Sequence, residues 1–135
     1  MIVVDTNLIV QIVLPGDAHE AALAVAARDS EWVAPALWRS ELRNVLATSM
    51  RVRRLKLADA VTAFEAADRL VTDFDLEEFP EGCLALAARG RISGYDAEFV
   101  FVAERLGKQL VSADRKLAKA FPGRVLSPEE FVTRG

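Results

Sequence analysis

Short apolar segments that alternate with longer amphipathic ones constrain this chain more than any other feature of its sequence. The first of them, Ile2-Val3-Val4, is β-branched throughout and stops at Asp5. Such a run is too short for a helix, and it has no polar alternation that would put one face in water. It therefore predicts a strand buried on both faces. We expect four further strands, over residues 32–34, 76–79, 109–112 and 124–126.

Segments with helical periodicity separate these predicted strands. Asp17 with Glu20 three residues later is typical of a capping box at a helix start, and Gly107 is typical of a helix end. The expected helices cover residues 17–28, 36–53, 57–71, 85–89 and 95–106, followed by a short helix to Phe121 and a last one after Ser127 with Pro128 in its first turn. This alternation predicts an α/β fold with a central, mostly parallel sheet flanked by helices on both faces.

The composition fits one domain spanning residues 1–135. Hydrophobic residues make up 52% of the chain, and no linker or low-complexity segment interrupts it. A single cysteine cannot form an internal disulfide, the first residues lack the basic region of a signal peptide, and no apolar run approaches the length of a membrane span. We therefore expect a cytoplasmic protein that does not associate with membranes. The net charge of −3 argues mildly against a nucleic-acid ligand.

Two acidic residues follow predicted strands closely. Asp5 comes directly after the first strand, and Asp114 lies two residues after the strand that ends at Ser112. In parallel α/β sheets the binding crevice lies beyond the carboxyl ends of the strands. These two positions therefore predict where a functional site would lie.

Two further acids fall on apolar faces of predicted helices. Helical projection places Glu41 between Leu37 and Val45, and it places Asp96 on the same face as Phe99. Asp96 also lies at the start of its helix, where a capping role is the alternative explanation. A carboxylate that faces a core without a partner is costly, so the fold must compensate for these charges.

Four acids that converge on one crevice cannot all stay ionised without a cation. Carboxylate oxygens, with no histidine or cysteine nearby, favour Mg²⁺ or Mn²⁺ over zinc. Such a site typically acts on phosphate esters, because the ion polarises phosphoryl oxygens and activates water. Thr6, Asn7 and Ser112 lie next to these acids and suit hydrogen bonds that orient carboxylates or water, although such residues are also common in turns.

Four short segments carry a resemblance to a known family. They are Val4-Asp5-Thr6-Asn7, Ser40-Glu41-Leu42, Tyr95-Asp96-Ala97 and Ser112-Ala113-Asp114-Arg115-Lys116-Leu117. In this order and at these separations they resemble the four acidic motifs of PIN-domain ribonucleases, and the likeness extends over nearly the whole chain. It is strongest to the VapC-type toxins of prokaryotic type II toxin–antitoxin systems.

The resemblance implies a single PIN-like domain that acts as a Mg²⁺- or Mn²⁺-dependent endoribonuclease. Asp5 and Asp96 are then expected to contact the metal, Asp114 to complete the cluster directly or through water, and Glu41 to hold a metal-bound water or help to deprotonate it. The resemblance also implies a homodimer and a VapB-like antitoxin whose C-terminal segment enters the acidic groove. The alternative is a PIN-like scaffold that binds RNA or a protein without cutting.

Two basic clusters could contact the RNA backbone or could simply be solvated surface. Their members are Arg51, Arg53, Arg54 and Lys56 between two predicted helices, and Arg115 and Lys116 after Asp114. Four of the 20 acids belong to the predicted metal site, so the charge of the remaining chain is slightly positive. With that correction the net charge does not argue against an RNA substrate.

One aromatic residue does not fit its helix. Phe101 falls on the polar side of the predicted helix over residues 95–106, together with Glu98 and Arg105. This position predicts either a partner surface or a helix that is buried on both sides.

Overall fold

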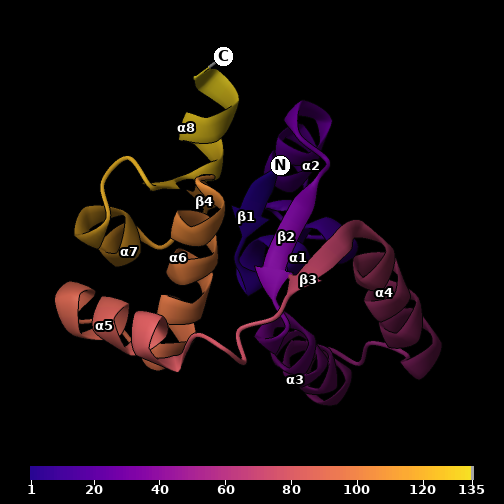
Figure 1. The fold of residues 1–135 in the computed structure, drawn as a ribbon. Helices are drawn as coiled ribbons and strands as arrows, with labels where there is room; N and C mark the ends of the chain where they lie inside the picture. The colour runs from indigo at the N-terminus through magenta and orange to yellow at the C-terminus, as the bar shows by residue number, and fades with distance from the viewer. Residues whose placement is uncertain (135) are drawn as a thin grey trace.

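A sheet of five parallel strands forms the middle layer of the domain (Figure 1). The computed structural model describes residues 1–134. Across the sheet the strands follow the order β3-β2-β1-β4-β5. Their bounds are β1 (Ile2–Val4), β2 (Trp32–Pro35), β3 (Val71–Phe74), β4 (Leu110–Val111) and β5 (Val125–Leu126). The predicted α/β fold with a parallel central sheet is confirmed.

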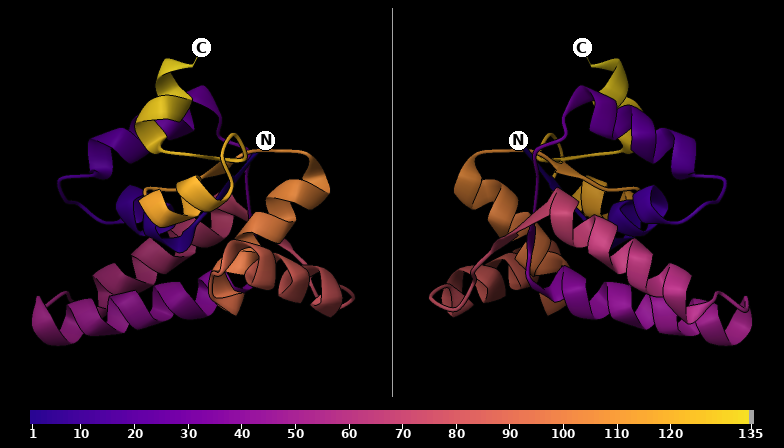
Figure 2. Two further views of the ribbon diagram at one scale, coloured as in Figure 1. Left: turned by 90° about the vertical axis from the view of Figure 1, so that its left-hand side faces the viewer. Right: turned by 90° about the vertical axis from the view of Figure 1, so that its right-hand side faces the viewer.

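Helices cover both faces of this sheet (Figure 2). Parallel strands are joined by right-handed crossovers, so α1–α4 lie on one face and α5–α7 on the other. The last helix, α8, packs beside α2 and β5. The bounds are α1 (Thr6–Val13), α2 (His19–Arg28), α3 (Leu37–Val52), α4 (Leu57–Leu70), α5 (Pro80–Gly90), α6 (Gly94–Leu106), α7 (Arg115–Ala120) and α8 (Pro128–Thr133).

Two tryptophans anchor the core around β2. Trp32 and Trp38 are both 0% exposed, as expected for core residues. Each indole N–H keeps a partner: Trp32 donates to the Asp29 carbonyl at 2.7 Å, and Trp38 donates to Asp73 Oδ1 at 2.7 Å. Burial of these large side chains is therefore obtained without an unsatisfied donor.

The third strand lies earlier in the chain than predicted. The apolar residues between 76 and 79 suggested a strand there, but β3 is formed by Val71–Phe74, which pairs with Trp32–Pro35 of β2. β3 is an edge strand, and two of its side chains are exposed and polar, so it lacks the apolar run of a central strand. Phe79 instead packs on Phe101 of α6, with ring centroids 5.1 Å apart.

The helix starts of α1 and α2 also differ from expectation. The sequence did not predict α1, whose apolar residues are mostly β-branched. In the structure the Asp5 carboxylate caps α1 by accepting a hydrogen bond from the Leu8 N–H at 2.9 Å. The predicted capping box at Asp17 is wrong, because α2 begins at His19 and no side chain caps it.

Phe101 is covered by protein rather than exposed. It is half-buried between α5 and α6, where its ring lies against Phe79 and against the backbone of Gly82. α6 is therefore packed on two sides, by the sheet and by α5, and its helical projection has no fully solvated face. The sequence predicted either a partner surface or a helix buried on both sides, and the structure shows the second.

The close approach of Gly82 to Phe101 generates a test of this packing. A Cβ atom at position 82 would overlap the Phe101 ring, whereas a Cβ at Gly94 would meet nothing within 4 Å. We expect Gly82→Ala to lower the free energy of unfolding by about 1–3 kcal/mol, through overpacking. Gly94→Ala is the control and should be neutral or slightly stabilising in urea unfolding. Equal stability of the two variants would contradict the α5–α6 packing.

Candidate active site

The strand order reverses between β1 and β4, and the predicted acids gather at this point. Helices after β1 and after β4 leave toward opposite faces of the sheet, which leaves a crevice beyond the carboxyl ends of these two strands. Val4 of β1 is paired with Val111 of β4, so the next residues, Asp5 and Ser112, emerge side by side.

A buried hydroxyl connects the two strand ends. Ser112 is only 1% exposed. Its Oγ accepts a hydrogen bond from the Asp114 N–H at 3.1 Å, and hydrogen bonding by the same hydroxyl lowers the pKa of Asp5. A single side chain directly after β4 thereby contacts the neighbourhood of both acids.

Asp5 and Asp114 are also helix N-caps. Asp5 Oδ1 accepts from the Leu8 N–H, and Asp114 Oδ1 accepts from the N–H groups of Lys116 at 2.9 Å and Leu117 at 3.1 Å. These charge-assisted bonds hold each carboxylate at the positive end of a helix. Each cap uses one carboxylate oxygen, and the second oxygen, Oδ2, takes no part in it.

Asp96 lies in the first turn of α6, but it is not the cap of that helix. The cap is Ser93, whose Oγ accepts from the Asp96 N–H at 3.0 Å. The capping alternative for Asp96 is therefore wrong. Its side chain is half-buried and close enough to Asp114 for the two charges to repel.

Glu41 reaches the same region from the second turn of α3. Its Oε1 accepts a hydrogen bond from the Thr6 hydroxyl at 2.6 Å. Thr6 directly follows Asp5, so this bond ties the start of α3 to the start of α1. Within residues 1–134, Thr6 and Ser112 are the two buried polar side chains, and both contact acids of the candidate site.

The electrostatics of the site are unfavourable to negative charge. Burial raises the pKa of Asp5, and the charges of Asp114 and Asp96 raise it further against the opposing hydrogen bonds from Ser112 and Leu8. Burial and the Asp114 charge likewise raise the pKa of Asp96. None of the salt bridges within residues 1–134 includes Asp5, Glu41, Asp96 or Asp114.

The donor chemistry of the site fits a hard divalent cation. Uncompensated carboxylates with free oxygens, flanked by hydroxyl groups, match the preferences of Mg²⁺ and Mn²⁺. In the part of the chain that is described, no three Asp, Glu, His or Cys side chains form a ready-made metal-binding group. The match is thus one of donor type and charge.

Comparison with known proteins identifies the family of this chain. A family model described as the PIN domain matches residues 2–121. The chain belongs to the PIN domain family. The likeness inferred from the four acidic motifs is thereby confirmed.

Two proteins similar to this PIN domain come from Pyrobaculum aerophilum. Its Ribonuclease VapC3 is 28% identical over 127 residues, which cover 92% of this chain and 97% of the relative. The crystal structure of PAE2754 superposes with a TM-score of 0.71 at 24% sequence identity, covering 98% of this chain and 93% of that chain. The likeness to PAE2754 concerns the fold alone.

One acid near the site was placed on the wrong side by the sequence. Glu98 was assigned to the polar face of α6, but it is half-buried, and its pKa is raised by burial and by the charge of Glu41. Periodicity could not reveal this, because α5 covers the face that the projection assigned to solvent. The one sign in the sequence that this face is covered was Phe101, an aromatic residue on the same face as Glu98.

The remaining predicted residues lie farther from the acids or at the surface. Asn7 is exposed in the first turn of α1. Arg115 and Lys116 are exposed in the first turn of α7, directly after Asp114.

The first basic cluster is separated from the acids by most of a helix. Arg51, Arg53, Arg54 and Lys56 lie at the far end of α3 and in the turn to α4. From Glu41 to Arg51 the helix rises by roughly 15 Å. In a single chain this cluster is therefore not beside the acids.

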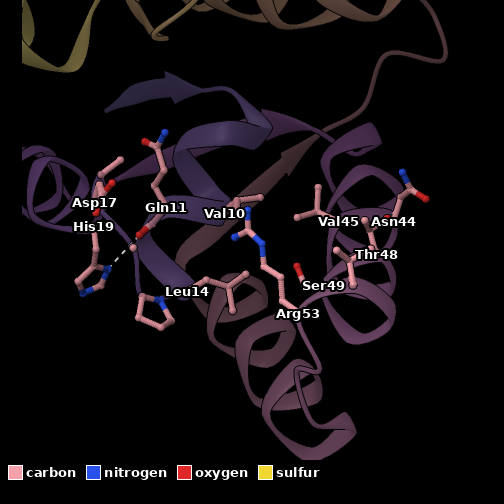
Figure 3. A pocket seen from close by; sticks show the side chains of 14 residues that line it. Val10, Gln11, Leu14, Asp17, His19, Asn44, Val45, Thr48, Ser49 and Arg53 are labelled. Carbon is pink, nitrogen blue, oxygen red and sulfur yellow. Dashed lines mark hydrogen bonds between the residues drawn. The ribbon is translucent and has the colours of Figure 1, made fainter.

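A recess of about 510 Å³ lies between α1, the start of α2 and α3 (Figure 3), and none of the four acids lines it. Val10 and Val45, one helical turn beyond Thr6 and Glu41, line it. His19 closes one side by a hydrogen bond between its Nδ1 and the Gln11 carbonyl at 2.9 Å. Arg53 also lines the recess, so the recess reaches the basic cluster.

No helix within residues 1–134 combines the length and the apolar character needed to cross a bilayer.

The raised pKa of Asp5 predicts how the stability of this PIN domain depends on pH. A raised pKa means that the native state holds the proton more tightly than the unfolded chain, so this contribution to stability is present at low pH and lost as pH rises through the raised pKa. Asparagine keeps the N-cap but cannot ionise. In chelator, we expect Asp5→Asn to gain roughly 2–5 °C in Tm over wild type as pH rises toward neutrality.

The control for this measurement is Asp17→Asn, at an exposed position. Its Tm should follow that of the wild type across the same pH range. An Asp5→Asn variant that is less stable than wild type at every pH would contradict the electrostatic account.

Proposed function

We propose that this protein is a metal-dependent endoribonuclease that acts as the VapC-type toxin of a toxin–antitoxin pair. The observation that carries the proposal is the set of carboxylates from β1, α3, α6 and β4 at one sheet edge, two of them held by the buried hydroxyls of Thr6 and Ser112. The family membership and the likeness to Ribonuclease VapC3 support it.

A bound Mg²⁺ or Mn²⁺ would polarise the phosphoryl oxygens of RNA and lower the pKa of the attacking water. Asp5 and Asp96 are the proposed direct ligands, and Asp114 completes the set directly or through water. The capping bonds on Oδ1 of Asp5 and Asp114 would hold these carboxylates in place, so that little side-chain freedom is lost on metal binding.

Glu41 is the proposed proton acceptor. The Thr6 hydroxyl occupies Oε1, which orients the carboxylate and leaves Oε2 free to take a proton from the attacking water. Glu98 lies near Glu41, and burial and the charge of Glu41 raise the pKa of Glu98. Asn7, exposed next to Thr6, is available to bind water or substrate.

The RNA backbone would be held by the basic residues that flank this edge. Arg115 and Lys116 are the nearest candidates, because they directly follow Asp114 and are exposed. The cluster from Arg51 to Lys56 would contact RNA only through a longer substrate or a second protomer. These contacts would make substrate binding weaker as salt is raised.

The proposed partners are an antitoxin of the VapB type and a second copy of the chain. The recess along α1 and α3 begins one helical turn from Thr6 and Glu41, and it carries both apolar and polar side chains. This lining suits a polypeptide segment that continues into the acidic groove. The proposed setting is the cytoplasm, where the toxin would meet both its antitoxin and RNA.

Cleavage of RNA in Mg²⁺ or Mn²⁺ tests the proposal. We expect wild type to cut single-stranded RNA and both Asp5→Asn and Asp96→Asn to lose activity by at least about a hundredfold, because each removes a charge that the metal requires. Asp17→Asn serves as the control and should match wild type. If the folded wild type cuts no RNA while still binding it, the protein is a silent scaffold and the enzyme proposal is wrong.

A second test addresses the buried hydroxyl. Ser112→Ala removes the hydrogen bond to Asp5 and the acceptor for the Asp114 N–H, so it loosens two proposed ligands without removing a charge. We expect the concentration of Mn²⁺ needed for half-maximal activity, and for half-maximal rise in Tm, to increase about 10–100-fold. Ser40→Ala, at an exposed position on α3, should change neither value.

A further inference from the structure

A second groove, of about 460 Å³, lies between α5 and the first turns of α6. Its apolar wall includes Leu76, Phe79 and Leu84, and its other side is formed by Ser93, Tyr95 and Glu98. Its volume lies within the range of small-ligand pockets. Neither the acids of the candidate site nor the recess along α1 and α3 accounts for it.

The groove adjoins the acidic site at the start of α6. Ser93, which lines it, also caps α6 and contacts Asp96, and Tyr95 is the residue before Asp96. Glu98 lies close enough to Glu41 for the two carboxylates to interact electrostatically. A strand of RNA with its phosphodiester at the acids would therefore place a neighbouring nucleotide at this groove.

The polar and aromatic groups of the groove match a nucleobase. Tyr95 is 64% exposed, which leaves a flat ring free for stacking at the edge of an apolar wall. Glu98 is half-buried, and none of the salt bridges within residues 1–134 includes it. Its carboxylate can accept two hydrogen bonds side by side but can donate none.

We propose that this groove binds one unpaired guanine of the RNA substrate next to the cleaved phosphodiester, with stacking on Tyr95 and with Glu98 accepting from the base. This inference rests on the proposed ribonuclease function. Guanine presents two adjacent donors, N1–H and the N2 amino group, on its Watson–Crick edge. Adenine and cytosine offer one amino group beside a ring-nitrogen acceptor, and uracil offers one N–H between two carbonyl acceptors, so each of them sets an acceptor against the carboxylate.

The test uses oligouridine that carries a single guanosine, inosine, adenosine or cytidine at successive positions. We expect wild type to cut next to guanosine about tenfold faster than next to inosine, which lacks only the N2 amino group. Glu98→Gln should abolish that ratio and leave the rate on plain oligouridine within about twofold. Glu81→Gln, at an exposed position on α5, is the matched control.

Tyr95 is tested separately from Glu98. Tyr95→Phe keeps the stacking ring and should retain the guanine preference, whereas Tyr95→Ala should weaken guanosine-dependent cleavage about tenfold. Binding of the same labelled oligonucleotides to Asp5→Asn, followed by fluorescence anisotropy, reports base preference without cleavage. If the oligonucleotides bind with a guanine preference but wild type does not cleave them, the guanine site is supported and the ribonuclease function is wrong. If wild type cleaves them without any base preference, only the guanine site is wrong.

Two other outcomes would overturn the inference. If Glu98→Gln slows every oligonucleotide equally and shifts the Mn²⁺ dependence, Glu98 belongs to the metal site. If Tyr95→Ala changes the molar mass in light scattering and leaves base preference intact, the groove is a contact between protein chains.

Discussion

The hydrogen bonds of the Ser112 hydroxyl are the contacts on which the candidate site depends. β1 and β4 are neighbours in the sheet, and their register brings Ser112 beside Asp5. The hydroxyl satisfies a buried carboxylate on one side and the Asp114 backbone on the other. Without it, a carboxylate already disfavoured by burial would lose a donor, and the turn into α7 would lose an acceptor. The geometry of two acids thus follows from one buried side chain.

Burying and grouping these acids lowers the stability of the fold, which a purely structural protein would avoid. Burial and mutual repulsion raise the pKa values of Asp5 and Asp96, and no basic side chain within residues 1–134 forms a salt bridge with them. On α3, by contrast, Arg39 forms salt bridges with Asp68 and Asp73. The proposed cation site rests on the carboxylates of Asp5 and Asp96, which are without such a basic partner in the described part of the chain. Perturbed carboxylates in a crevice are typical of function rather than of stability.

Much of the fold could be predicted because strand and helix periodicities are local properties. The errors have local causes as well. β3 was misplaced because an edge strand needs no apolar run, and the apolar residues after it serve α6 instead. α1 was missed because its β-branched residues have weak helix propensity, which the Asp5 cap and packing against the sheet overcome. Glu98 was misassigned because α5 covers a helix face that projection alone left to solvent.

The sequence by itself determined the parallel α/β fold and the four acids, because a buried strand and an acid on an apolar helix face both leave a periodic signal. Only the tertiary structure decided how these acids meet. The reversal of strand order brings residues 5 and 112 together across more than a hundred positions, and no local pattern encodes that pairing. It also decided that the groove beside Tyr95 and Glu98 opens next to Asp96, since this requires α5 to fold back over α6. Long-range packing, which depends on all elements at once, is what a reading along the chain cannot supply.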